Sequence, residues 1–242
     1  MSLNPRTSRW SVAAAAGALS ITLLVSPGTT SPTVGAERGV ATAAAAMPHR
    51  MAGMTMAGMT ALPRNRSQAA LYLEMRRLWG QHMEWTYATV AAFVQGSPAL
   101  DATLKRLLRN QVDIGEAIKP FYGARAGRQL TRLLTTHIKD AVPVLVAAQS
   151  GDTRAFTRAE RAWYANAKQI ADFLAAANPA WHKRAMEQMM RTHITQTTTY
   201  AADQLQARFA RSIRDYGKAE RHMRQMADML SAGLVQEFPG RF

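Results

Sequence analysis

Residues 75–83 (MRRLWGQHM) decide the fold, because their pattern returns twice along the chain. The second copy is LTRLLTTHI from Leu130 and the third is MEQMMRTHI from Met186. In each copy, the residues seven, four and three positions before the histidine and the residue after it are apolar. Steps of three and four place these residues and the histidine on one face of an amphipathic helix. Each copy therefore predicts a helix whose histidine faces the core or lies near it.

A second pattern lies between these helices. Asn110, Asn166 and His222 occupy matching positions, and each is followed six residues later by an acid: Glu116, Asp172 or Asp228. One helix carrying a histidine and one helix carrying the second pattern would then alternate three times. The sequence therefore predicts an all-α domain over residues 67–242, a six-helix antiparallel bundle built from three repeated helical hairpins, with its last internal turn near residues 206–208.

The composition agrees with a helical domain and limits the kinds of partner that the protein is expected to bind. The chain has 242 residues, is 48% hydrophobic and carries a formal charge of +14. Such a charge favours an anionic partner, for example an anionic envelope polymer or lipid. The basic residues are scattered along the helices, so we expect no specific nucleic-acid binding. There is no cysteine, which excludes disulfides, thiolate catalysis and thiolate metal sites.

Residues 1–36 have the pattern of a signal peptide. Arg6 and Arg9 precede an apolar run over residues 10–25, which is short for a membrane span. A Pro/Gly/Ser/Thr-rich stretch and the small residues of VGA follow, so we expect cleavage after Ala36. An uncleaved anchor is the alternative. Either way, the segment predicts a secreted or cell-surface protein.

Residues 37–66 are rich in Ala, Met, Gly and Thr and show no apolar periodicity, which predicts a flexible linker. Within it, MPHRMAGMTMAGM resembles the Met/His-rich segments of copper-handling proteins. Thioether sulfur suits Cu(I) and imidazole suits Cu(II) as well, so this segment predicts a copper or silver site. A low-complexity tether whose methionines bind nothing is the alternative. The candidate ligands are His49, Met51, Met54, Met56 and Met59.

Four further stretches carry a resemblance to a protein family: LWGQHMEWTYATVAAF, RLLRNQVDIGEAIKPFYG, WYANAKQIADFLAAANP and MADMLSAGLVQEFPGRF. They resemble a family of bacterial helical proteins, often exported in actinobacteria, that has no established activity. The resemblance covers residues 67–242 and implies a helical fold and export. Some members are labelled glycosyltransferases, but this chain has no Asp-x-Asp motif and no alternating strand and helix pattern for a nucleotide-sugar site.

The repeated histidines have two readings. His82, His137 and His193 could meet at one level and bind zinc or copper, with His222 as a further candidate ligand in the core. The rival reading is a hydrogen-bonded pair inside each hairpin, in which His82 faces Asn110, His137 faces Asn166 and His193 faces His222. Such pairs would recur with the repeat and need no metal.

The acids Glu116, Asp172 and Asp228 are expected at the flank of the core face, where they would pair with basic residues or lie in solvent. No nucleophile and base can be assigned, so the sequence does not identify an enzyme. The function predicted from the sequence is binding of a soft metal ion, copper or silver, through the tail of an exported bundle. The alternative is a non-enzymatic module that binds an anionic envelope component.

Overall fold

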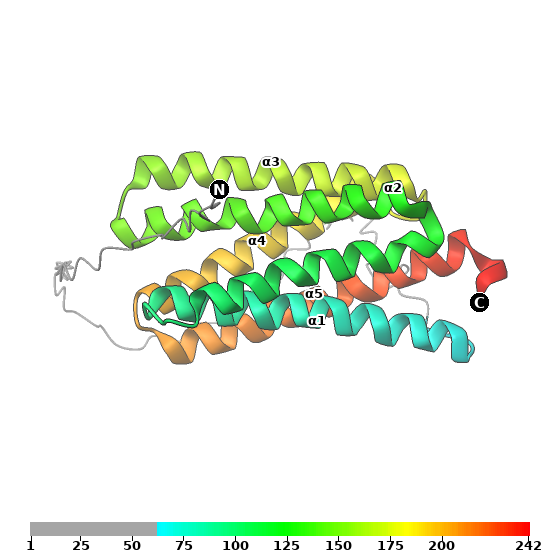
Figure 1. Cartoon of the computed structure of the whole chain (residues 1–242), viewed down its shortest axis with the longest axis horizontal. Coiled ribbons are helices and arrows are strands. Elements are labelled where there is room, and N and C mark those ends of the chain that lie inside the picture. Colours follow the sequence, from blue (N-terminus) through cyan, green and yellow to red (C-terminus); the bar gives the residue numbers. More distant parts are fainter. Residues whose placement is uncertain (1–61) are drawn as a thin grey trace, which may run out of the picture. The chain divides into compact units, whose positions relative to one another are not determined.

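The computed structural model describes residues 62–242, and all of its regular structure is helical. The helices are α1 (Arg66–Val94), α2 (Leu100–Ser150), α3 (Thr153–Ala177), α4 (Lys183–Leu205) and α5 (Phe209–Glu237), followed by the short 3₁₀ helix η2 (Pro239–Arg241) (Figure 1). The prediction of an all-α fold is thus confirmed for this part of the chain. Within residues 62–242, none of the helices is both long enough and apolar enough to cross a membrane. The predicted signal peptide and the tail ligands His49, Met51, Met54, Met56 and Met59 lie outside the described residues.

Residues 62–242 form five α-helices where six were predicted, because α2 is continuous through Pro120. Its non-helical residue is Gly123, with φ +80° and ψ 169°. Residues with a side chain rarely adopt such a positive φ, so glycine permits the chain to change direction here. The first half of α2 (residues 100–122) and the second half (residues 124–150) then run side by side in opposite directions (Figure 1).

A close backbone approach holds these two halves together near the bend. A Cβ atom built on Gly115 would lie 2.7 Å from the carbonyl oxygen of Gly127, and one built on Gly127 would lie 2.6 Å from the carbonyl oxygen of Gly115. Both distances are shorter than real carbon–oxygen contacts. The two helices can therefore approach this closely only because both positions are glycine.

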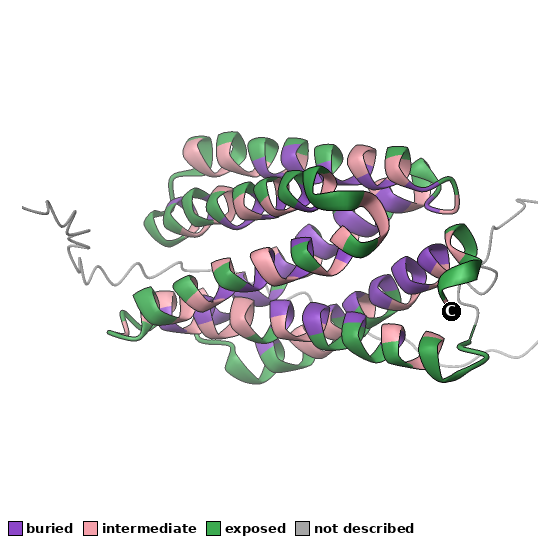
Figure 2. Cartoon of the chain, turned by 45° about the vertical axis from the view of Figure 1, so that its right-hand side comes forward, coloured by how far each residue is buried: buried purple, intermediate pink, exposed green. Residues whose placement is uncertain are grey.

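The helices pack in a closed order. α1 packs against α2, α2 against α3, α3 against α4 and α4 against α5, and α5 returns to α1, while α4 also contacts α1 and α2. The buried residues line the inner faces of the helices and the exposed ones lie outside (Figure 2). This order places α1, α2 and α4 around a common interior.

The helix ends show how local sequence sets the boundaries. Asn65 caps α1, since its side-chain oxygen accepts from the backbone N–H of Gln68 at 2.9 Å. Between α4 and α5 the chain turns at residues 206–208, as predicted, and Ala207 has a positive φ of 55°.

Candidate functional site

His82 on α1, His137 on the second half of α2 and His193 on α4 meet in the interior of the bundle and line one cavity. The ring centres of His82 and His193 are 5.4 Å apart, and those of His137 and His193 are 5.6 Å apart. All three residues are at most 3% exposed. His193 thus lies between the other two, and the three helices deliver three imidazoles to one place.

The apolar pattern around each histidine explains this placement. The residues seven, four and three positions earlier, and the residue that follows, belong to the hydrophobic core or pack against it. The core face of each helix therefore carries its histidine inward, as predicted from the spacing. These core residues are Met75, Leu78, Trp79, Met83, Leu130, Leu133, Leu134, Ile138, Met186, Met189, Met190 and Ile194.

His137 makes the predicted pair with Asn166. The amide nitrogen of Asn166 donates to the carbonyl oxygen of Leu133 at 3.1 Å, which leaves its Oδ1 atom facing His137 Nδ1 at 2.9 Å. Because Oδ1 can only accept, the proton of His137 is on Nδ1. Its Nε2 atom then carries no proton and has a free lone pair. This buried atom has no hydrogen-bond partner among the described residues.

His82 has a different partner from the one predicted. Its Nδ1 atom lies 3.3 Å from the amide nitrogen of Gln111, which also donates to Leu107 O at 2.8 Å. Asn110, the expected partner, instead donates to the carbonyl oxygen of Leu78 at 3.0 Å. Since the Gln111 nitrogen is a donor, His82 Nδ1 accepts and its proton is on Nε2. The Oε1 atom of Gln111 is buried and has no partner in residues 62–242.

The predicted pair of His193 and His222 is likewise not formed as a hydrogen bond. His222 Nε2 donates to the carbonyl oxygen of Met189 at 3.0 Å. The Nδ1 atom of His193 is buried and no described residue bonds to it. His222 is half-buried and is not among the residues that line the cavity, so the structure does not bring this candidate ligand to the other three.

The three side chains of the second pattern nevertheless make the same kind of hydrogen bond to a backbone carbonyl group. Asn110, Asn166 and His222 each donate to the carbonyl oxygen four residues before a histidine, at 3.0, 3.1 and 3.0 Å. These carbonyl groups belong to Leu78, Leu133 and Met189. In an α-helix, this carbonyl group already accepts the backbone N–H of the histidine. It therefore accepts a second hydrogen bond from a side chain of the neighbouring helix.

Burial keeps the three histidines uncharged at neutral pH. It lowers the pKa of His82 to about 3, with a smaller effect from the neighbouring His137. Burial also lowers the pKa of His137 to about 4. The pKa of His193 falls well below 6.5, again chiefly through burial and then through His82 and His137. Neutral imidazole is the form that binds a metal ion or accepts a hydrogen bond.

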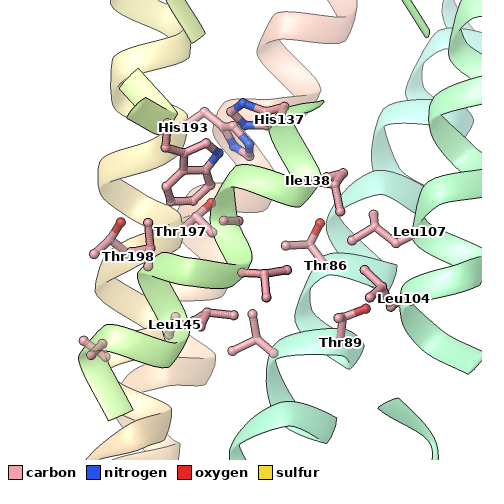
Figure 3. A pocket seen from close by; sticks show the side chains of 18 of the residues that line it. Thr86, Thr89, Leu104, Leu107, His137, Ile138, Leu145, His193, Thr197 and Thr198 are labelled. Atoms are coloured by element: carbon pink, nitrogen blue, oxygen red, sulfur yellow. The ribbon is translucent and has the colours of Figure 1, made fainter. Parts of the chain in front are cut away.

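The cavity below the histidines has a volume of about 110 Å³. It extends from His137 and His193 past Thr197 toward Leu145, Leu104 and Thr89 (Figure 3). Within residues 62–242, its lining holds no carboxylate, lysine or arginine, and its histidines are neutral. The hydroxyl groups of Thr86 and Thr89 donate to carbonyl groups of their own helix at 2.6 and 2.7 Å. The Thr197 hydroxyl bonds to the side chain of Tyr200, whereas that of Thr198 is buried without a partner in the described part of the chain.

The acids of the second pattern do not reach this site. Asp228 forms an ion pair with Arg76 at 2.6 Å, Asp172 with Lys168 at 2.6 Å and Lys183 at 2.9 Å, and Glu116 with Lys119 at 2.5 Å. The expected pairing with basic residues is thus found. Across residues 62–242, no group of three or more His, Asp or Glu side chains is already placed to hold a metal ion.

Sequence reasoning missed Gln111 and the threonines. Gln111 follows Asn110 directly and lies four residues after the buried Leu107, a spacing that could have placed it on the core face. Thr197 follows His193 by four residues on the same face, by the same signal.

Comparisons with known proteins add nothing to this geometry. The chain matches no protein-family model, no curated protein and no solved structure. The resemblance to exported bacterial helical proteins remains an expectation from the sequence.

Proposed function

We propose that this protein is an exported metal-binding protein whose bundle holds a transition-metal ion, copper or zinc, between His82, His137 and His193. The single observation that supports this is that His137 Nε2 and His193 Nδ1 are buried, uncharged and unpartnered in the described chain, and that both side chains line one cavity. An imidazole nitrogen binds zinc at about 2.0–2.1 Å, which puts two bound rings roughly 5 Å apart. The ring separations of 5.4 and 5.6 Å are close to that requirement.

The ligands would be recruited in two steps. His137 already has the arrangement typical of a metal ligand, because its Nδ1–H donates to Asn166 and so presents Nε2. His193 Nδ1 supplies the second free atom. His82 becomes the third ligand when its proton moves from Nε2 to Nδ1, which frees Nε2. The Gln111 side chain would then turn so that its Oε1 accepts from His82 Nδ1, and it would give up the bond from its Nε2 to Leu107 O. The rings themselves also have to turn toward a common point, since no ligand set is ready-made in residues 62–242.

The tail supplies a second, separate proposal. His49, Met51, Met54, Met56 and Met59 are five soft or borderline ligands within eleven residues of a chain without cysteine. We propose that they bind copper or silver and deliver it to, or keep it from, the bundle. Copper is then the one metal that suits both ligand sets.

The finer architecture belongs to the same proposal. We infer that the bundle consists of three equivalent hairpins, α1 with the first half of α2, the second half of α2 with α3, and α4 with α5. Support comes from the matching hydrogen bonds of Asn110, Asn166 and His222 to the carbonyl groups that precede the three histidines. In that case each hairpin contributes one imidazole to the site.

The test is a titration of Cu(I), Cu(II) and Zn(II) into four proteins: the mature chain, a form lacking residues 47–59, His137→Ala and the control His182→Ala. His182 is exposed and does not line the histidine cavity. A ligand that binds only the folded state at a hundred times its Kd stabilises it by about 2.7 kcal/mol. For a domain of this size that raises Tm by roughly 5–10 °C.

We expect this rise in the mature chain, the shortened form and His182→Ala, and its loss in His137→Ala. The tail proposal predicts a lower metal stoichiometry without residues 47–59 and an unchanged rise in Tm. An equal rise in His137→Ala and in the mature chain would exclude the core site. A stoichiometry that survives removal of residues 47–59 would exclude the tail site.

The formal charge of +14 favours one alternative, a non-enzymatic module that binds an anionic envelope polymer or lipid. Its affinity for anionic vesicles should fall steeply with salt and survive removal of residues 47–59, because the charge lies on the helices. Binding that does not change with salt would exclude this alternative.

A further inference from the structure

The cavity is larger and more apolar than a metal site needs. Most residues that line its volume of about 110 Å³ are apolar side chains of α1, both halves of α2, α3 and α4. They include Val90, Leu104, Ile138, Leu145 and Phe156. An apolar cavity of roughly 150 Å³ stays dry and binds benzene or xenon. This cavity is somewhat smaller but has the same kind of lining, so one small ring is the largest ligand we expect it to hold.

A polar atom without a partner stands at the histidine end of the same cavity. His137 Nε2 carries a lone pair and is buried, and no residue of the described chain bonds to it. The neighbouring Thr197 hydroxyl on α4 (Figure 3) instead bonds to the side chain of Tyr200. A buried acceptor without a donor is unfavourable, so a ligand that brings one donor gains more than its apolar contacts. The cavity therefore favours an apolar ligand that carries a single hydroxyl group at its edge.

We propose that the cavity binds a small neutral phenol, with its ring among the apolar side chains and its hydroxyl group donating to His137 Nε2. This goes beyond the proposed metal site and does not need a metal ion. A charged ligand is disfavoured, because no carboxylate, lysine or arginine of the described residues lines the cavity. An imidazole that accepts from the phenol cannot bind a metal with the same nitrogen, so the two ligands should compete.

A partly exposed residue of the second half of α2 belongs to the cavity lining. Val142 lines the cavity and is 38% exposed, and the next residue of the same helix face, Val146, is 49% exposed. We therefore expect a ligand to enter beside Val142.

The experiment uses the full chain freed of metal with a chelator, and compares phenol with benzene by calorimetric titration. We expect phenol to bind roughly three- to tenfold more tightly than benzene, as one added hydrogen bond allows. In His137→Leu this preference should vanish. Ala141→Leu fills the cavity and should weaken phenol binding, whereas the matched control Ala126→Leu, on the same helix and also half-buried against the core, should not.

Three results would overturn the proposal. They are absence of phenol binding to the metal-free chain, equal binding of phenol and benzene, and equal losses in Ala141→Leu and Ala126→Leu. Thermal unfolding of each variant separates a filled cavity from a misfolded bundle. Metal titration of Ala141→Leu keeps the two proposals distinct, because its three histidines are intact. A normal metal response with no phenol response in the unsubstituted chain would reject the phenol site alone.

Discussion

The Oδ1 atom of Asn166 lies 2.9 Å from the Nδ1 atom of His137, and this contact decides which nitrogen of His137 carries the proton. The same side chain donates to Leu133 O, so one amide fixes both the register of two helices and the tautomer of a candidate ligand.

Asn166→Ala should therefore destabilise the fold and disturb the site. It removes both bonds and leaves the buried Nδ1–H of His137 without an acceptor and the Leu133 carbonyl with its helical bond alone, which costs about 2–4 kcal/mol. Urea unfolding with an unchanged m value would report the loss. The exposed Gln188→Ala is the control and should change stability by less than about 0.5 kcal/mol. A cost for Asn166→Ala as small as that of the control would show that the pair contributes little.

Acid should unfold the bundle from an unusually high pH. The folded-state pKa values of His82 and His137 are about 3 and about 4, below the ordinary value of 6.5, and that of His193 is also depressed. The unfolded chain therefore binds protons first as pH falls, so this stability is complete above pH 6.5 and is lost as pH falls from there toward 4. Each histidine contributes up to about 1.4 kcal/mol per pH unit in that range.

The measurement is the urea midpoint between pH 7.5 and pH 5. His182→Ala should keep the steep slope and His137→Leu should reduce it, because only the second change removes a buried titrating group. A midpoint that stays constant over this range would contradict the placement of three neutral histidines in the interior.

Gly233→Ala should be strongly destabilising, although alanine favours helices. A Cβ atom at Gly233 would overlap the indole ring of Trp181, which is 2% exposed and cannot move outward freely. Overpacking of this kind costs about 1–3 kcal/mol. Gly80→Ala is the matched control, since nothing lies within 4 Å of its Cβ position, and it should stabilise α1 by about 1 kcal/mol. Thermal unfolding of both variants decides this, and shifts of the same sign would contradict the packing at Trp181.

The turn between α4 and α5 should depend on Arg208. Asp203 is 1% exposed, and Arg208 donates to its carboxylate at 2.6 and 2.9 Å, while Arg211 approaches the other carboxylate oxygen at 3.5 Å. Arg208→Ala leaves the buried carboxylate with Arg211 as its remaining ion-pair partner and should cost about 2–3 kcal/mol, less than breaking a fully buried pair because Arg208 is 43% exposed. Arg214→Ala, an exposed arginine of α5, should cost less than about 0.5 kcal/mol in the same urea titration.

The sequence predicted the inward histidines because a period of 3.6 residues determines the face of a helix. It predicted the turn at residues 206–208 from the spacing of the repeated pattern. It did not predict that His82 faces Gln111. Asn110 and Gln111 are adjacent and about 100° apart on the helix, so their partners depend on how far α1 and α2 rotate and slide against each other. That offset is set by packing of side chains from both helices and is not encoded in either one alone.

The cavity could not be predicted for a related reason. Small residues of α2 and α4 line it, among them Ala141, Ala148 and Ala201. In the sequence, each alanine indicates only that the segment favours a helix. Likewise, Pro120 favoured a helix end, but the chain changes direction at Gly123, where the backbone can adopt a φ of +80°.

The two halves of α2 are in backbone contact at Gly115 and Gly127, only a few residues either side of the bend. Closing so short a loop loses little chain entropy, so this contact can form early in folding and without waiting for the remaining helices. The last hairpin, by contrast, must bring α5 back to α1 across most of the chain. We expect the bend at Gly123 to set the order in which the bundle assembles, with substitutions at Gly115 slowing folding and substitutions on the α1 and α5 contact mainly speeding unfolding.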